Sequence, residues 1–177
     1  MGQIAFRFAA RKARAAIHGM LLEAGTLDLH TVLKTCYFAD KAHLNLHNRP
    51  IFGATYKAMR FGPVPLEIYE MAKGEAYWLA ELNAERYPWS LNGYRVHLDD
   101  NGEPERDVLP QSDTDALSAA LTKSRSMNFS ERTAATHGPD WQAARMGMMS
   151  YEDMLDDTDE KNERIAWLRE AGQHLRL

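Results

Sequence analysis

The stretch that decides the fold is DLHTVLKTCYFADKAHLNLHNRP, residues 28–50. Asp28 is a suitable helix N-cap, because its carboxylate can accept a hydrogen bond from a free amide of the first turn. Leu29–His47 carries apolar residues at helical spacing, and Pro50 stops the helix by disfavouring helical backbone before it. The stripe is apolar in its first half and polar in its second, so we expect the helix to leave the core toward an edge.

Further helices are predicted on both sides of this segment. Apolar spacing over Phe6–Leu21 indicates an amphipathic helix that ends near Gly25. In the C-terminal half the helix signals are capping residues and prolines. They are Ser112 with Asp115, Ser130 as an N-cap, Pro139 in a first turn, Ser150 with Asp153, and a last helix over Glu160–His174.

Residues 85–110, ERYPWSLNGYRVHLDDNGEPERDVLP, differ from the rest of the chain. Apolar residues alternate around Val96, and Asn92-Gly93 and Asn101-Gly102 are strong turn signals. One or two small antiparallel hairpins are expected here. The predicted fold class is therefore α+β, a predominantly helical single domain with a small antiparallel β-hairpin or sheet.

A second extended segment precedes a rigid turn. Ile51–Arg60 lacks helical periodicity and is followed by Gly62-Pro63-Val64-Pro65. Proline fixes φ and removes a backbone donor, whereas glycine permits conformations that other residues resist. This turn is expected to hold the short helix Leu66–Ala72 firmly after the extended segment.

Side chains presented by such a rigid turn lose little entropy when they bind a partner. Tyrosine and arginine are frequent anchors of protein interfaces. We therefore predict a partner-binding surface, with the alternative that Tyr56 and Phe61 are core residues and the turn is only structural. The predicted partner-binding residues are Tyr56, Lys57, Arg60, Phe61 and Arg49.

Composition supports one cytoplasmic domain. The chain has 177 residues, of which 45% are hydrophobic, and this suffices for a core. No apolar run approaches the roughly 18 residues of a membrane span. The single cysteine, Cys36, excludes an internal disulfide and suits a reducing compartment. Its position on an apolar stripe predicts a buried and unreactive thiol.

Charge is unevenly distributed along the chain. Residues 1–60 hold nine Lys and Arg against three Asp and Glu, whereas residues 61–110 hold four against ten. The asymmetry can steer an acidic partner, but we favour the simpler interpretation that the two parts of the fold attract each other. A DNA-binding regulator stays open as an alternative, although the net charge of −4 argues against a nucleic-acid partner.

His43 and His47 are the pair that most resembles a metal site. Helical spacing places both imidazoles on one face, and Asp40 lies one turn earlier. Zinc hydrolases of the His-Glu-x-x-His kind need a glutamate where this chain has Leu44. We therefore predict no metal and no cofactor, and instead a polar pair of Asp40 and His43 that hydrogen-bonds neighbouring loops. A metal-dependent hydrolase is the weaker alternative, and no catalytic residues are assigned.

Residues 32–70, VLKTCYFADKAHLNLHNRPIFGATYKAMRFGPVPLEIYE, resemble the signature of the Panacea domain. This is the family of SocA-like antitoxins, which also includes phage-associated GepA proteins. A second block in the C-terminal half matches the Thr-His pair that the family places close to a proline and a tryptophan. The matching residues in the two blocks, with His43 beside them, are Tyr37, Ala39, Asp40, Arg49, Pro50, Ile51, Gly53, Tyr56, Ala58, Gly62, Pro63, Val64, Thr136, His137, Pro139 and Trp141.

The resemblance implies an antitoxin of a toxin–antitoxin module, which neutralises a cognate toxin protein by binding it. It also implies an adaptor role, in which the antitoxin presents the toxin to a AAA+ protease of the ClpXP kind. It is not an enzyme on this interpretation. Residues 1–155 would form the Panacea domain, and residues 156–177 a C-terminal helix packed on it or extending it. Segment 75–110 matches nothing in the family pattern.

Overall fold

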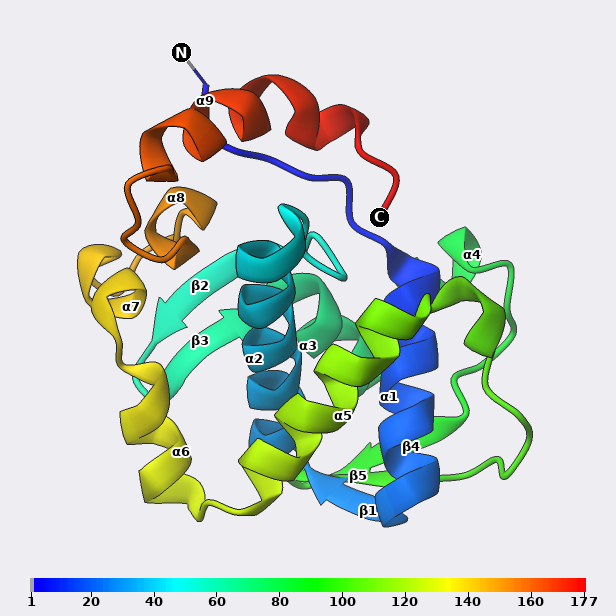
Figure 1. The fold of residues 1–177 in the computed structure, drawn as a ribbon. Helices are drawn as coiled ribbons and strands as arrows, with labels where there is room; N and C mark the ends of the chain where they lie inside the picture. The colour runs from blue at the N-terminus through cyan, green and yellow to red at the C-terminus, as the bar shows by residue number, and fades with distance from the viewer. Residues whose placement is uncertain (1) are drawn as a thin grey trace.

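The computed structural model describes residues 2–177 and places α2 (Leu29–His47) at the centre of the molecule (Figure 1). Asp28 caps it as predicted, since its carboxylate accepts from the amide of Thr31 at 2.9 Å. Asn48, with a left-handed φ of 56°, ends the helix two residues before Pro50. The predicted bounds of this helix are confirmed.

The second half of α2 does not leave the core, so that expectation is wrong. Asp40 is 0% exposed and His43 is 1% exposed. Both polar side chains are buried because other parts of the chain satisfy them with hydrogen bonds, which is the usual condition for burying polar groups.

The remaining helices surround α2, with α5 packed along it and α1 on the same side of the molecule (Figure 1). None of the helices within residues 2–177 is long and apolar enough to cross a membrane. They are α1 (Ala10–Ala24), α3 (Leu66–Lys73), α4 (Ala76–Glu81), α5 (Gln111–Arg125), α6 (Phe129–Thr136), α7 (Pro139–Ala143), α8 (Tyr151–Met154) and α9 (Lys161–Ala171), with single turns of 3₁₀-helix η1 (Arg106–Val108) and η2 (Gly172–His174).

Two small antiparallel sheets complete the fold and confirm the predicted fold class. A three-stranded sheet has the order β1-β5-β4, and a two-stranded hairpin pairs β2 with β3. The turn of the β4–β5 hairpin follows Asn92, as predicted, whereas Asn101-Gly102 forms no hairpin. The strands are β1 (Thr26–Asp28), β2 (Tyr56–Met59), β3 (Gly62–Pro65), β4 (Trp89–Asn92) and β5 (Arg95–Leu98).

The N-terminal helix starts later than its apolar pattern suggests. It begins at Ala10 and ends at the predicted Gly25, while the residues before it are extended. Phe6 packs edge-on against Tyr151 with ring centroids 4.8 Å apart, and Phe8 packs similarly against Trp78. Tertiary packing of these rings, rather than helix formation, accounts for the apolar residues before Ala10.

Two predicted capping residues are wrong. The N-cap of α6 is Asn128, whose side chain and that of Glu131 bond each other's backbone amides, so Ser130 lies inside the helix. The N-cap of α5 is Pro110, and the hydroxyl of Ser112 lies 3.0 Å from Nε2 of His43 instead. Pro139 and Ser150 do open α7 and α8 as predicted.

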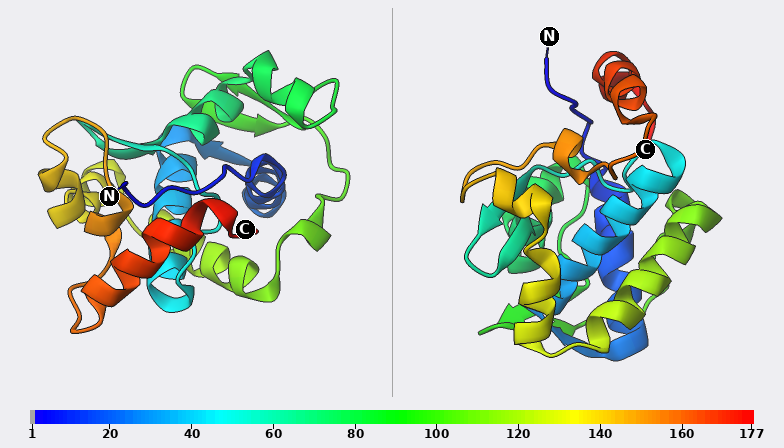
Figure 2. Two further views of the ribbon diagram at one scale, coloured as in Figure 1. Left: turned by 90° about the horizontal axis from the view of Figure 1, so that it is seen from above. Right: turned by 60° about the vertical axis from the view of Figure 1, so that its left-hand side comes forward.

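The C-terminal residues pack onto the rest of the fold. Figure 2 shows α9 crossing the end of the molecule beside the N-terminal segment. Leu168 of α9 is fully buried, and the guanidinium of Arg164 donates to the carbonyls of Leu44 and Asn45 at 3.0 and 3.1 Å. These contacts cap the C-terminal end of α2. The division of the chain into a domain over residues 1–155 and a C-terminal helix over residues 156–177 stays a prediction.

Gly62 is the position where the β2–β3 hairpin has least room. Its φ is +106°, and an added Cβ would lie 2.4 Å from Oγ1 of Thr136. We predict that Gly62→Ala lowers the free energy of unfolding by about 3 kcal/mol, because backbone strain and a steric clash add. Such a loss corresponds to a melting temperature lower by roughly 6–12 °C.

Gly74→Ala is the matched control for the hairpin variant. Gly74 also has positive φ, +87°, but nothing lies within 4 Å of an added Cβ. This control is expected to lose only about 1 kcal/mol from strain. Equal melting temperatures for the two variants in a calorimetric scan would show that the contact with Thr136 is unimportant.

Candidate functional site

The carboxylate of Asp40 joins α2 to the segment that follows it. It accepts hydrogen bonds from the backbone amides of Ile51 at 2.7 Å and Phe52 at 2.9 Å, and from the hydroxyl of Tyr56 at 2.8 Å. Burial raises the pKa of Asp40 to about 6, although these hydrogen bonds favour the charged form. Asp40 thus fixes where the chain leaves α2 and where β2 begins.

A second buried carboxylate, that of Asp113 on α5, has three basic side chains as neighbours. Lys12 lies 2.5 Å from it, Arg49 2.8 Å and the ring of His43 3.1 Å. Burial alone raises the pKa of Asp113, but hydrogen bonds from His43, Lys12 and Arg49 outweigh it and hold the pKa well below its ordinary value. The sequence did not indicate a functional role for Asp113, because its burial depends on partners that are distant in the chain.

The cluster also decides the role of the predicted histidine pair. His43 contacts the carbonyl of Arg49 through Nδ1 at 2.8 Å and Ser112 through Nε2. Both ring nitrogens are therefore engaged within the chain, and His47 only stacks on the same ring. No group of three or more His, Cys, Asp or Glu side chains in residues 2–177 is arranged to hold a metal ion. The predicted hydrogen bonds of Asp40 and His43 to neighbouring segments are confirmed, in the core rather than at an edge.

Cys36 is fully buried, and burial raises the pKa of its thiol well above the ordinary value. This confirms the prediction of a packed thiol.

The second block of motif residues meets the first around the hairpin. The hydroxyl of Tyr37 donates to Asp140 at 2.5 Å, and the indole of Trp141 donates to the carbonyl of Met59 at 2.9 Å. The ring of His137 stacks on Trp141 with centroids 3.7 Å apart. Residues about 100 positions apart in the sequence thus connect α2 and the hairpin to α7.

Backbone positions of the motif serve the same framework. Gly53, with a φ of +65°, lies so close to the N-terminal segment and to Leu177 that an added Cβ would come within 2.9 Å of Phe6. Val64 is 8% exposed. Thr136 is fully buried, and its hydroxyl donates to backbone carbonyls of its own helix. Most motif residues therefore shape the interior, while Gly62 and Val64 also line the groove described below.

Two of the five predicted partner-binding residues are held inside the fold. Tyr56 is 2% exposed, because alternation along β2 turns Tyr56 and Ala58 toward the core. Its assignment to a surface is wrong, and the alternative of a core residue is correct for Tyr56. Arg49 keeps a side chain that is only 20% exposed and is paired with Asp113, so it too is mainly structural.

The other predicted residues lie at the outer end of the hairpin. Arg60 and Phe61 form the exposed turn between β2 and β3, and Lys57 is half-buried on β2. The outer edge of β2 is covered by the segment before α8, since the amide of Met149 donates to the carbonyl of Tyr56. The hairpin therefore presents its turn to solvent, rather than the outer edge of β2.

The hairpin turn borders a groove of about 750 Å³ between α2, α3, α6 and the β4–β5 turn. Figure 1 shows α6 lying beside the β2–β3 hairpin. Phe129 of α6 contacts Phe61 of the hairpin turn. The lining is mainly apolar and aromatic. It consists of Asp28, Leu29, His30, Leu33, Lys34, Met59, Arg60, Phe61, Gly62, Val64, Tyr69, Tyr94, Phe129 and Arg132.

Several large side chains of this groove are exposed. Phe61 is 47% exposed, Phe129 44% and Tyr94 83%. The rings of Phe61 and Phe129 meet edge-on at 5.1 Å, and the guanidinium of Arg60 lies 5.2 Å from the Phe61 ring. Aromatic residues, arginine and methionine are the types that protein interfaces favour. We call this region, lined as above, the aromatic groove.

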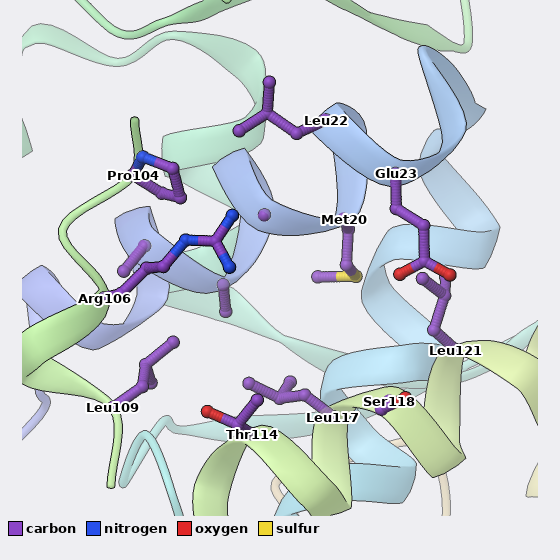
Figure 3. Close-up of a pocket in the computed structure, with 13 residues that line it drawn as sticks. Met20, Leu22, Glu23, Pro104, Arg106, Leu109, Thr114, Leu117, Ser118 and Leu121 are labelled. Atoms are coloured by element: carbon purple, nitrogen blue, oxygen red, sulfur yellow. The ribbon is translucent and has the colours of Figure 1, made fainter. Parts of the chain in front are cut away.

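A smaller hollow of about 370 Å³ lies between α1, α5 and the segment before η1 (Figure 3). Met20, Leu117 and Leu121 line it, and Glu23 and Arg106 are its only charged lining residues within residues 2–177. It contains no aromatic side chain and no convergent polar groups. The aromatic groove is therefore the stronger candidate for a binding site.

The basic residues of the N-terminal helix are largely neutralised within the chain. Arg11 and Arg14 both pair with Glu105, and Lys12 pairs with Asp113. These pairs support the interpretation that the charge asymmetry reflects attraction between parts of the fold. They also weaken the DNA-binding alternative, because paired cations have less to gain from phosphates.

Comparison with known proteins gives one match. A family model described as "Antitoxin SocA-like, Panacea domain" matches residues 32–142. This range contains both blocks of motif residues, the hairpin and nearly all of the aromatic groove. No curated protein and no solved structure matches the chain.

Lys34, which lines the aromatic groove, leads to a prediction of how the stability of the protein depends on pH. It is 1% exposed, and burial together with nearby Arg132 lowers its pKa to about 7. Between pH 7 and the unfolded pKa near 10.5, only the unfolded chain holds this proton, so raising the pH favours folding. We expect the stability of the wild type relative to Lys34→Met to rise across this window, by at most about 1.4 kcal/mol per pH unit.

Urea unfolding at a series of pH values from 6 to 10 measures this difference. Lys123→Met, which removes an exposed lysine of α5, is the control and should stay parallel to the wild type. Parallel curves for the wild type and Lys34→Met would contradict a lysine that is neutralised by burial.

Proposed function

The chain belongs to the SocA-like antitoxin family defined by the Panacea domain, and from this premise we propose that it binds and neutralises a cognate toxin protein. The aromatic groove is the proposed contact surface. Two of its exposed residues, Arg60 and Phe61 on the hairpin turn, carry the interaction, together with Lys57 of β2. Neutralisation then follows from occupying a surface of the toxin and requires no chemical step.

The observation that carries this proposal is an exposed aromatic cluster on a rigid support. Phe61 lies in the turn of a hairpin whose two strands are hydrogen-bonded in a fixed register, with Ala58 opposite Pro63. Behind it, Trp141 and Lys34 bond the carbonyls of Met59 and Pro63. Little conformational entropy is left to lose at this turn, which favours tight binding.

A further part of the proposal concerns the fate of the toxin. We propose that the bound antitoxin presents the toxin to a AAA+ protease, as the family resemblance suggests. The half-life of an epitope-tagged toxin tests this part separately. It should shorten when the antitoxin is co-expressed and lengthen again in cells that lack the protease, whereas an unchanged half-life would leave neutralisation by binding alone.

Co-expression tests the class of function most simply. The open reading frame next to this gene should be toxic when expressed alone in bacterial cells and tolerated when this chain is expressed with it. Growth that is equally poor with and without this chain would contradict an antitoxin role toward that neighbour.

Variants of the hairpin turn test the contact surface. We predict that Arg60→Glu combined with Phe61→Ser weakens capture of the toxin at least about tenfold, because interface anchors of these types are commonly worth 1–2 kcal/mol or more. The melting temperature should change little, since both side chains are exposed.

Arg86→Glu is the matched control, an exposed arginine in the loop before β4. It makes the same charge change away from the aromatic groove and should leave capture unchanged. Full capture by the hairpin double variant, or an equal loss in both variants, would remove the aromatic groove from the interface.

A further inference from the structure

The two buried lysines of the core differ in their partners. Lys12, 5% exposed, is paired with the carboxylate of Asp113 at 2.5 Å. Lys34, 1% exposed, donates only to the carbonyl of Pro63, at 2.6 Å. Within residues 2–177 no carboxylate lies within 4 Å of its ammonium. An ammonium has three donors, so two of those on Lys34 have no acceptor among residues 2–177.

The position of Lys34 relates this property to the aromatic groove. Lys34 lines the groove together with the exposed rings, and the end of its side chain lies beside Gly62 on the hairpin. Buried charges ordinarily have a partner of opposite sign, because an uncompensated one is strongly unfavourable. A carboxylate that enters the groove from another molecule would supply that partner.

The charged groups around Lys34 favour an anion as well. Arg60 and Arg132 also line the groove, whereas His30, whose Nδ1 accepts from the guanidinium of Arg132 at 3.1 Å, is neutral because burial lowers its pKa to about 4. Among the described residues that line the groove, Asp28 has the only carboxylate; as the cap of α2 it accepts two hydrogen bonds from Thr31, and it lies 3.8 Å from the guanidinium of Arg132. Charge complementarity therefore selects an acidic group among possible ligands.

Geometry favours a carboxylate over a phosphate. Arg132 already donates to the carbonyls of Ser124 and Met127 and to His30, so its guanidinium fork has little free to clamp a phosphate. The exposed rings of Phe61, Phe129 and Tyr94 instead offer apolar area next to a single buried ammonium. This combination suits a carboxylate attached to an apolar or aromatic group.

We propose that the aromatic groove recognises a partner segment in which an acidic side chain stands beside an apolar one, with the carboxylate bound by Lys34 and the apolar group by Phe61 and Phe129. This inference rests on the proposed function, because it specifies the chemistry of the toxin surface that the antitoxin binds. It assigns Lys34 a recognition role in addition to its bond to Pro63.

A pair of small probes tests the inference without the toxin. Indole-3-acetate and indole-3-acetamide share one ring system and nearly one shape, and differ in charge. Because burial lowers the pKa of Lys34 to about 7, the titration of the full chain is followed by amide NMR at pH 6, where its side chain is an ammonium. We expect the acid to bind about tenfold more tightly than the amide, as for a hydrogen bond to a charged group. The shifted amides should belong to residues around Lys34, Phe61 and Phe129.

Variants and a second anion complete the test. Lys34→Met should make the acid bind no better than the amide, whereas Lys123→Met should preserve the difference. Inorganic phosphate should bind at least about tenfold more weakly than indole-3-acetate, since it gains nothing from the rings.

Any of these results would overturn the proposal: no binding of the acid, equal affinities for acid and amide, or a preference that survives Lys34→Met. Tight phosphate binding would overturn it also, by indicating a general anion site. The toxicity rescue is a separate measurement, so an antitoxin that rescues growth but ignores the probes would refute this inference and leave the proposed function standing.

Discussion

The buried carboxylate of Asp40 connects the centre of the fold to its surface. It sits on α2 and accepts from two backbone amides of the following loop and from the hydroxyl of Tyr56. Without these bonds, two amides and a phenol would be buried without partners, each at a cost of about 1–3 kcal/mol. The direction of the loop, and with it the start of the β2–β3 hairpin, depends on this one side chain.

Together with Asp40, the residues of the family motif form one framework that supports the hairpin. Tyr37 and Asp140 link α2 to α7, Trp141 supports the carbonyl of Met59, and Gly62 allows the hairpin to approach Thr136. These residues are the interior of a support, and what the support presents is the aromatic groove with its exposed turn. Framework and contact surface are thus different sets of residues, which meet at the hairpin turn and at the floor of the groove.

The sequence predicted the elements better than the site. The cap at Asp28, the turn after Asn92 and the helix of α2 are local features, set by nearby side chains, and they were foreseen. The burial of Asp40, the pairing of Asp113 with Lys12 and the inward face of Tyr56 depend on residues tens of positions away. The predicted turn at residues 62–65 is wrong, because these residues form strand β3, and the turn lies just before it at Arg60 and Phe61, which are exposed as expected. Tyr56, on the preceding strand, faces the core.

The residues that line the aromatic groove could not be predicted from local sequence patterns either. Phe129 and Tyr94 come from separate elements and meet Phe61 only through the fold, and Lys34 looks like one more residue of an amphipathic helix. The tertiary fold determines that Lys12 pairs with a carboxylate, whereas Lys34 donates to a backbone carbonyl.

Hydrogen–deuterium exchange of the purified toxin complex tests the central claim most directly, namely that the aromatic groove is the surface this chain uses. The account predicts that binding slows exchange at the hairpin turn, residues 59–62, at the start of α6 and at the turn around Tyr94. Unchanged exchange in these three segments, with protection elsewhere on the molecule, would contradict it.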